Sequence, residues 1–158
     1  MKGRVALVTG GSRGIGRAIA VKLSALGADV AIVYAGREDA ARETVELLEA
    51  QGSRALAIRC DVSDYSQAEA AVKQVAEKLG NVDILINNAG IVRDALAMRM
   101  SAEDFAAVID VNLNGAFHMI RACLPALVRR RSGRIVNITS VAGLMGNAGQ
   151  ANYASSKA

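Results

Sequence analysis

Short apolar runs alternate with segments of helical periodicity along the whole chain, and this alternation limits the folds that the chain can adopt. The runs are rich in β-branched residues and nearly continuous in hydrophobicity, which is typical of strands buried on both faces. They lie at Val5–Thr9, Asp29–Tyr34, Arg54–Arg59, Asp83–Asn87 and Arg134–Thr139. Because parallel strands need crossover connections, the pattern predicts an α/β fold with a doubly wound parallel sheet of strand order 3-2-1-4-5.

The segments between these runs contain signals for the beginning and end of helices. Ser63 or Asp64 is expected to cap the third helix, and Gly80 lies where a left-handed residue would end that helix. The second helix is expected to end in the same way at Gly52. These signals support the alternation of strands and helices.

A longer helix is predicted after the fourth strand. Ser101–Asp104 resembles a capping box and is expected to start a helix that reaches about Arg131, bent or broken near Pro125. Asn112 lies inside this helix although asparagine is a poor helix former, so we expect that a backbone distortion or a bound water there uses its amide. His118 is assigned to a helix face without a function.

The composition fits one domain with a substantial core. The 158 residues are 52% hydrophobic but only 3% aromatic, so the core is expected to consist of Ala, Val, Ile and Leu, together with the two phenylalanines. No internal repeat or linker divides residues 1–158, which we interpret as a single Rossmann domain. Disordered, collagen-like and disulfide-rich classes are excluded by this composition.

Several features predict a cytoplasmic protein without a metal site. Cys60 and Cys123 lie in different predicted elements without metal-ligand spacing, so we expect buried free thiols. No apolar run approaches the ~18 residues of a membrane span, and the N-terminus leads directly into a strand without the features of a signal peptide. We therefore expect no membrane partner.

The formal net charge is +4, and the basic residues are scattered except for a cluster formed by Arg129–Arg131 and Arg134. A surface that binds nucleic acid usually combines a basic stripe with aromatic residues that stack on bases. Because aromatic residues are missing from this cluster, nucleic acid is not an expected partner.

The sequence Thr-Gly-Gly-Ser-Arg-Gly-Ile-Gly follows the first predicted strand and opens the first helix. Glycines at such a turn let a pyrophosphate approach the backbone, and the N–H groups of the helix N-terminus can bind it. The spacing departs from the commoner Gly-x-Gly-x-x-Gly, and an ordinary tight turn is the alternative. Its placement after the first strand favours nucleotide binding by Gly10, Ser12, Arg13, Gly14, Ile15 and Gly16.

The end of the second strand indicates which dinucleotide is bound. An NAD site usually has an acidic residue about 20 residues after the glycines, where it binds the ribose 2′-hydroxyl. Here Arg37 occupies that region, and Glu38 and Asp39 are expected to begin the next helix. Together with Arg13, Arg37 suits a 2′-phosphate and therefore NADP, although a solvated loop cation is the alternative.

Two further motifs follow strand ends. Asp61 and Val62 come after the third strand, where the carboxylate can accept a hydrogen bond from an adenine amino group; a helix-capping aspartate is the alternative. Asn87–Gly90 ends the fourth strand, where two amides can tie loop backbones together and Gly90 permits close approach of a ribose. A turn without a ligand would also explain this motif. Asn88 and Gly90 are therefore candidate cofactor-binding residues.

The candidate catalytic residues lie near the end of the chain. Tyr153 and Lys157 are four residues apart, so a helix would place both side chains on one face. A neighbouring ammonium favours the phenolate form of tyrosine, which makes Tyr153 a candidate general acid. Ser140 closes the fifth strand, where its hydroxyl can bind a substrate carbonyl. A chance pair on an amphipathic helix and an ordinary turn serine are the alternatives.

Together these motifs resemble the classical short-chain dehydrogenase/reductase family over the whole chain. Five motifs occur in the family's order, which makes the resemblance specific. They are the glycine turn, Asp61-Val62, Asn87–Gly90, Asn112, and Ser140 with Tyr153-x-x-x-Lys157. Within the family, the stretch from Ser140 to Tyr153 is most similar to the 3-oxoacyl-acyl carrier protein reductases of type II fatty-acid synthesis.

The resemblance implies an NADPH-dependent reduction of a 3-oxoacyl thioester, carried on acyl carrier protein, to the 3-hydroxyacyl thioester. It implies that Tyr153 protonates the carbonyl oxygen, while Lys157 favours the phenolate and binds the nicotinamide ribose. It also implies that Ser140 orients the carbonyl and that Asn112 holds a water of a proton relay. Tyr153 and Lys157 are thus expected to serve both catalysis and cofactor binding.

The chain departs from the family in length, because relatives continue beyond the equivalent of Ala158 and assemble as homotetramers. We therefore expect a fragment of a longer reductase that lacks its C-terminal strands, with weak or no activity alone and an exposed apolar edge at the fifth strand. The resemblance gives Arg129–Arg131 an expected role in docking the acidic carrier protein. Complementing a helix C-terminus is the alternative for this cluster.

Two other functions compete with this interpretation. A related reductase that acts on another ketone, a sugar or a steroid is the runner-up among enzymes, since the sequence does not specify the substrate. A dinucleotide-binding module that has kept the fold and lost the chemistry is the alternative from a different class.

Overall fold

The computed structural model describes residues 1–158, and a five-stranded parallel sheet with the order β3-β2-β1-β4-β5 lies at its centre. The strands are β1 (Val5–Thr9), β2 (Asp29–Tyr34), β3 (Ala55–Arg59), β4 (Ile84–Asn87) and β5 (Arg134–Asn137). The predicted doubly wound sheet and its strand order are confirmed. β3 and β4 each begin one residue later than predicted, and β5 ends two residues earlier.

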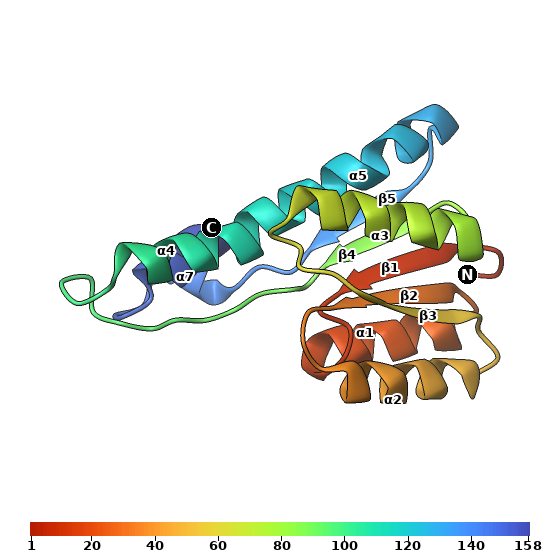
Figure 1. Ribbon diagram of the computed structural model, residues 1–158, viewed down its shortest axis with the longest axis horizontal. Helices are drawn as coiled ribbons and strands as arrows, with labels where there is room; N and C mark the ends of the chain where they lie inside the picture. Colours follow the sequence, from red (N-terminus) through yellow and green to blue (C-terminus); the bar gives the residue numbers. More distant parts are fainter.

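Four helices cover the two faces of the sheet (Figure 1). On one face lie α1 (Gly14–Ala25) and α2 (Glu38–Glu49), and on the other lie α3 (Tyr65–Lys78) and α5 (Gly115–Arg130). All neighbouring strands pair in parallel, so each connection crosses over one face of the sheet. The result is a three-layered α/β/α arrangement in which the carboxyl ends of all strands meet at one edge.

Successive residues of a strand pack on opposite faces of the sheet, and this divides the core in two. Leu7 lies in the cluster beneath α3 and α5, together with Leu85 and Met119. The next residue, Val8, lies in the cluster beneath α1 and α2, together with Ile32. Because both faces need apolar side chains, these strands consist of nearly continuous hydrophobic runs.

The predicted signals at the ends of α3 are confirmed. Asp64 is the N-cap, and its carboxylate accepts hydrogen bonds from the backbone N–H groups of Ser66 and Gln67. The Ser66 and Gln67 side chains also donate to it, and these hydrogen bonds lower the pKa of Asp64 to about 2. Gly80 follows the helix with a φ of +112°, and its N–H donates to Val75. Gly52 ends the turn after α2 with a φ of +84°.

The long helix after β4 has three parts: α4 (Ala102–Ile109), a π-helical turn (Asp110–Asn114) and α5. Ser101 caps α4, as expected. The distortion predicted at Asn112 is confirmed, because Asn112 is the central residue of the π-helical turn. The predicted break near Pro125 is wrong. Pro125 lies on the exposed side of α5, where the carbonyl that loses its N–H partner can bond to water, so the helix continues.

The core contains both cysteines but neither phenylalanine. Cys60 and Cys123 are buried free thiols, as predicted. Burial raises the pKa of Cys60 to about 11 and that of Cys123 to about 12. The expected place of the phenylalanines in the core is wrong, because Phe105 is 41% exposed and Phe117 57% exposed. On the same helical segment, Met119 and Cys123 face the sheet instead, which leaves both rings on its outer side.

A buried carboxylate joins three elements at the amino-terminal edge of the sheet. Asp83 is 5% exposed and accepts hydrogen bonds from Arg4 at 3.0 Å, from Arg130 at 2.9 Å and from the Val5 backbone at 2.9 Å. Burial raises the pKa of Asp83, but these hydrogen bonds and the two guanidinium charges outweigh it and hold the pKa below its usual range. Arg130 is therefore tied to the sheet rather than free within the basic cluster.

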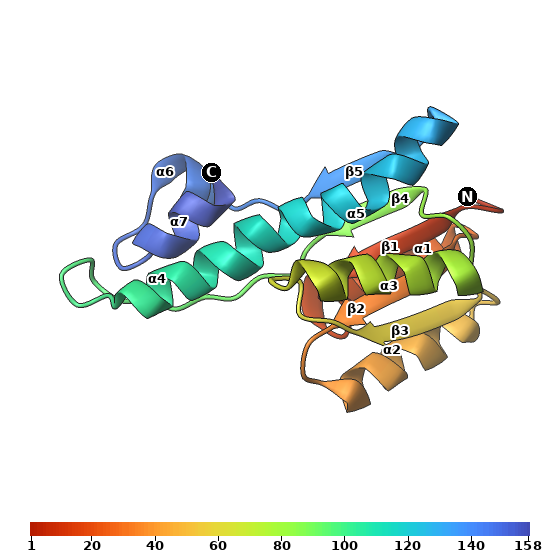
Figure 2. The same ribbon diagram turned by 45° about the horizontal axis from the view of Figure 1, so that its top comes forward.

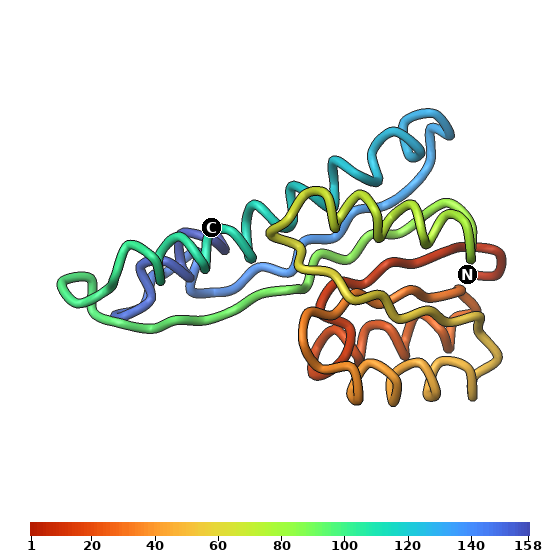
Figure 3. The backbone as a smooth tube through the Cα atoms, in the orientation of Figure 1, coloured from red at the N-terminus to blue at the C-terminus, as the bar shows by residue number.

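Three helices extend beyond the opposite edge, where the strands end. They are α4, α6 (Val141–Met145) and α7 (Ala151–Lys157), and Figure 2 shows them beyond the arrowheads of the strands. The tube in Figure 3 follows the irregular segment after β4 as it passes beneath this group. The Ala95 N–H donates to Gly149 there, at 2.9 Å. None of the helices combines the length and the apolar character that crossing a bilayer requires.

Candidate active site

The turns that follow β1 and β4 are joined by hydrogen bonds at the point where the strand order reverses. The Thr9 hydroxyl, 2% exposed, accepts from the backbone N–H groups of Asn88 at 3.0 Å and Ala89 at 2.9 Å. In return, the Asn88 side chain donates to the carbonyl oxygens of Thr9 at 2.9 Å and Gly10 at 3.3 Å. The predicted role of Asn88 in tying loop backbones together is therefore confirmed.

Asn87 does not share this role, and the prediction that both amides tie the loops is wrong. Its side-chain nitrogen donates to Asn137 on β5 at 2.9 Å, and its side-chain oxygen is buried without a hydrogen-bond partner. Consecutive residues of a strand point to opposite faces. Only one of two adjacent amides can therefore reach the β1 turn.

The glycine turn brings the N-terminus of α1 against the end of β1. A side chain at Gly16 would place its Cβ 2.3 Å from the Gly10 oxygen and 2.6 Å from the Asn88 side-chain nitrogen. Gly10 itself has a φ of +66°, which favours glycine. Gly16 thus allows the close approach of α1 to the end of β1, and it is not among the residues that line the cleft described next. Its expected contact with the cofactor stays a prediction.

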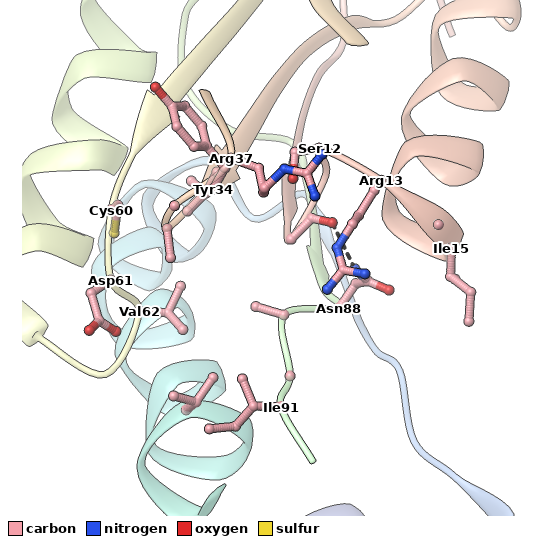
Figure 4. Close-up of a pocket in the computed structure, with 18 residues that line it drawn as sticks. Ser12, Arg13, Ile15, Tyr34, Arg37, Cys60, Asp61, Val62, Asn88 and Ile91 are labelled. Carbon is pink, nitrogen blue, oxygen red and sulfur yellow. Dashed lines mark hydrogen bonds between the residues drawn. The ribbon is translucent and has the colours of Figure 1, made fainter. Parts of the chain in front are cut away.

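A cleft of about 470 Å³ opens at the carboxyl ends of the strands (Figure 4). Its volume lies in the range of small-molecule sites. Ten of the predicted cofactor-binding residues line it: Gly10, Ser12, Arg13, Gly14, Ile15, Arg37, Asp61, Val62, Asn88 and Gly90. The sequence analysis missed eight further lining residues: Val33, Tyr34, Ala35, Gly36, Cys60, Ala89, Ile91 and Val111.

The charges around the cleft are unevenly distributed. Figure 4 shows Arg13 and Arg37 on one side and Asp61 on the other. Arg37 is exposed and forms only a long, solvent-exposed contact with Asp39, at 3.4 Å, so its guanidinium can turn toward a ligand. No carboxylate lines the cleft at the end of β2, because Glu38 and Asp39 lie in the first turn of α2, as predicted. This side of the cleft is suited to a phosphate.

The side of the cleft around Asp61 is held by contacts within the chain. The Asp61 carboxylate accepts from the backbone N–H and the hydroxyl of Ser63, at 3.0 and 2.7 Å, whereas the cap of α3 is Asp64. His118 Nδ1 lies 3.0 Å from the Val62 carbonyl oxygen. His118 therefore supports a residue that lines the cleft, a role that its isolated position in the sequence did not indicate.

Lys157 brings α7 next to Gly90, which lines the cleft. Its ammonium donates to the Ile138 carbonyl at 2.9 Å and lies so close to Gly90 that a Cβ there would be 3.6 Å from Nζ. Desolvation by burial lowers the pKa of Lys157. Tyr153 lies on the same helix and is half-buried, and its hydroxyl has no hydrogen-bond partner within the chain. Neither Lys157 nor Tyr153 belongs to the wall of the cleft itself.

Ser140 begins the helix that packs on α7. Its hydroxyl oxygen accepts from the Ala142 N–H at 3.2 Å and so caps α6, which leaves its proton free for donation. A Cβ on Gly143 would lie 2.4 Å from the Lys157 carbonyl oxygen, so α6 and α7 are in close contact. The structure thus brings the elements that carry Ser140, Tyr153 and Lys157 together.

The amide of Asn112 connects three parts of the site. It accepts from the Ile91 N–H at 2.8 Å and donates to the Ile91 carbonyl at 3.1 Å and to the Ser156 hydroxyl at 2.9 Å. Both N–H groups of this amide are therefore directed to protein groups. The water that the resemblance implies at Asn112 stays a prediction. Asn112 instead fixes the chain after β4 against the π-helical turn and α7.

The fold and the motifs are those of a known family, since residues 4–158 match the model of the short chain dehydrogenases. The chain belongs to the short chain dehydrogenase family. It is 48% identical over 153 residues to the 3-oxoacyl-acyl carrier protein reductase FabG of Staphylococcus aureus, covering 97% of this chain and 62% of that protein. It is 46% identical over 157 residues to FabG of Escherichia coli, covering 99% of this chain and 63% of that protein.

A solved structure supports the family assignment. A candidate short-chain alcohol dehydrogenase from Sinorhizobium meliloti superposes with a TM-score of 0.95 at 36% identity, covering 99% of this chain and 62% of that one. The chain therefore spans slightly more than 60% of the length of the relatives that it matches.

Replacing Thr9 with valine should uncouple the two turns, because the isosteric side chain leaves the N–H groups of Asn88 and Ala89 without this acceptor in a partly buried place. We expect a loss of about 2 to 4 kcal/mol in the free energy of unfolding. Thr9→Ser keeps the hydroxyl and should cost only about 1 kcal/mol for the lost methyl group. Urea unfolding of both variants measures the difference, and equal losses would contradict this account of the junction.

Proposed function

We propose that the protein is an NADPH-dependent reductase that converts 3-oxoacyl thioesters of acyl carrier protein to 3-hydroxyacyl thioesters. One observation supports this most directly: a cleft with two guanidinium groups and no carboxylate at the end of β2 has the Lys157 ammonium next to Gly90 in its wall. The names of the curated relatives support the choice of substrate. The proposal includes a cytoplasmic protein that is homotetrameric at full length.

The residues of the cleft fit a phosphorylated dinucleotide. The glycine turn offers the N–H groups of the first turn of α1 to a pyrophosphate, and no side chain of Gly10 or Gly14 obstructs them. Arg13 and Arg37 would bind the 2′-phosphate. Asp61 and Val62 lie where an adenine would be held, across the cleft from both arginines.

Lys157 is suited to bind a ribose at the other end. An ammonium has three N–H donors, and the Ile138 carbonyl accepts from one of them. The other donors are available next to Gly90, where the missing side chain leaves room for a ligand. Burial makes an ammonium with unused donors costly, so hydrogen bonds that it donates to the oxygens of a bound ribose would stabilise the charged form.

The side chains of α6 and α7 can carry out the protonation step of a carbonyl reduction. When bound, the dihydronicotinamide supplies a hydride to the carbonyl carbon. Ser140 donates its free hydroxyl proton as a hydrogen bond to the carbonyl oxygen and orients it. Tyr153 transfers its phenolic proton to that oxygen, which gives the alcohol, and the Lys157 ammonium stabilises the phenolate that is left. The phenolate then regains a proton from solvent.

The acidic carrier protein is proposed to dock at the exposed members of the basic cluster. Arg129 and Arg131 are exposed at the end of α5, whereas Arg130 donates to Asp83 and to the Val82 carbonyl. Of the three consecutive arginines, Arg129 and Arg131 are therefore free to meet an acidic partner. Charges at the rim of such an interface mainly increase the rate of association.

Arg37→Ala tests the cofactor. Loss of a charge-assisted contact to the 2′-phosphate should raise the Kd of NADPH about 10- to 100-fold and leave that of NADH nearly unchanged. Fluorescence titration with both nucleotides measures this. Arg42→Ala is the matched control, because Arg42 is exposed on α2, pairs with Glu38 and does not line the cleft. An equal change for NADPH and NADH in Arg37→Ala would argue against the 2′-phosphate contact.

Tyr153→Phe separates catalysis from binding in the full-length protein. Removal of the proposed general acid should lower kcat about 100- to 10,000-fold with NADPH and an acetoacetyl thioester. The enhancement of NADPH fluorescence on binding should persist, because the ring is retained. Unchanged turnover in the variant would reject Tyr153 as the acid. A wild-type protein that binds NADPH without turnover would instead be a binding module.

Reversal of charge at Arg129 and Arg131 tests the docking surface. The double variant to glutamate should raise the KM for a carrier-bound substrate about tenfold and spare a small thioester analogue. Lys22→Glu with Arg42→Glu changes the net charge equally on the helices of the opposite face and should leave both KM values unchanged. If the carrier-bound and the small substrate respond alike, the docking surface lies elsewhere.

A further inference from the structure

The helix that carries Tyr153 is too short to be stable without contacts to other elements. α7 has seven residues, and its N-cap residue, Gln150, makes no side-chain capping bond. Isolated helices of this length are not stable in water, so contacts with other elements must fix where α7 lies. Those contacts therefore determine where the Tyr153 hydroxyl lies relative to the cleft.

Asn152 makes the most buried of these contacts. Its side chain is 0% exposed, although asparagine is usually found at the surface. Its amide nitrogen donates to the Arg93 carbonyl at 2.9 Å and, more weakly, to the Asp104 carbonyl at 3.4 Å. Its amide oxygen accepts from the N–H of Tyr153 at 2.7 Å. One side chain thus joins the backbone of Tyr153 to the segment after β4 and to the first turn of α4.

The segment that Asn152 reaches depends on these bonds in turn. The chain between β4 and α4 has almost no regular structure of its own. Gln150 donates to both oxygens of Asp94 at 3.1 Å, and the Ala95 N–H donates to the Gly149 carbonyl at 2.9 Å. The start of this segment, at Ile91, lines the cleft. The backbone beside the cleft and the N-terminus of α7 are therefore held as one unit.

Two adjacent pairs of residues divide α7 into two faces. Asn152 and Ser156 are four residues apart and buried, and Ser156 accepts from Asn112 on the π-helical turn. Tyr153 and Lys157, one residue further along, form the neighbouring face, and Lys157 reaches Gly90. Side chains four apart in a helix lie above one another. The first pair anchors the helix, and Lys157 of the second pair lies next to Gly90 in the wall of the cleft.

We propose that Asn152 is a positioning residue for the reduction, which sets the place of the Tyr153 hydroxyl by tying α7 to the segment after β4. This inference rests on the proposed function, because it assigns to Asn152 a role in placing the proton donor of that reaction. Asn152 itself touches neither substrate nor cofactor, since its polar atoms are occupied by backbone groups. Its effect is therefore expected in kcat more than in the affinity for NADPH, because the Ile138 carbonyl and the bond between Asn112 and Ser156 hold the Lys157 end of α7.

Three variants of the full-length protein test this role. Asn152→Ala removes all of the side-chain bonds, and a misplaced general acid should lower kcat about 100-fold while the Kd of NADPH changes less than about twofold. Ser155→Ala is the matched control, because Ser155 is exposed on the same helix and its hydroxyl bonds only within it. Its kcat should equal that of the wild type.

Asn152→Asp provides a readout that loss of packing alone would not give. At pH 8 its carboxylate would face the Arg93 and Asp104 carbonyl oxygens, and kcat should fall as in Asn152→Ala. Protonation restores a donor to the Arg93 carbonyl, so activity relative to wild type should recover about tenfold by pH 6, whereas Asn152→Ala should not recover. Arg93 holds the pKa of the nearby Asp104 carboxyl below its usual range, so that group keeps its charge in this interval.

The outcomes separate this inference from the proposed function. If the wild type turns over and Asn152→Ala has the same kcat, the positioning role is overturned and the proposed function is not. Absence of wild-type turnover would overturn the proposed function, and NMR of ring-labelled tyrosine then decides whether Asn152 positions the ring. One sharp Tyr153 signal in the wild type and Ser155→Ala, and several or broadened signals in Asn152→Ala, support positioning. An identical Tyr153 signal in all three proteins rejects it.

Discussion

The hydrogen bonds between Thr9 and the start of the turn after β4 determine the geometry of the whole site. They lie where the strand order reverses, so the crossovers that follow β1 and β4 leave the sheet on opposite faces and their turns diverge. Because the two turns diverge, this strand order leaves a cleft between them. The buried Thr9 hydroxyl and the Asn88 amide hold the two turns together and so set the distance between them.

The π-helical turn lets a helical segment that packs on the sheet also contact the chain beside the cleft, through Asn112. α5 approaches the loop after β3 so closely that a Cβ on Gly115 would lie 2.6 Å from the Val62 side chain. One turn before it, the π-helical geometry places the Asn112 amide inward, where it bonds to Ile91 and Ser156. In a regular helix, the residues could not both pack on the sheet and direct this amide inward.

Local patterns predicted the fold and most of the cleft, because the glycine turn, Asp61 and Asn88 each follow a strand whose own residues identify it. What they missed depends on partners far apart in the chain. Arg130 belongs to a visibly basic cluster, yet its carboxylate partner lies 47 residues away. Asn152 bonds to a carbonyl 59 residues earlier. Backbone acceptors have no signature in a sequence, so neither Asn152 nor the contact of His118 with Val62 was identifiable.

Two kinds of interaction hold the residues of the site in place. The cleft is built from strand ends and their turns, which the buried sheet holds in place. The side chains proposed to donate protons lie beyond the sheet on α6 and α7, five and seven residues long, where only Ala142, Asn152 and Ser156 are buried. Buried amides and hydroxyls replace the missing core there, and their directional bonds fix an orientation that apolar packing alone would leave less well defined.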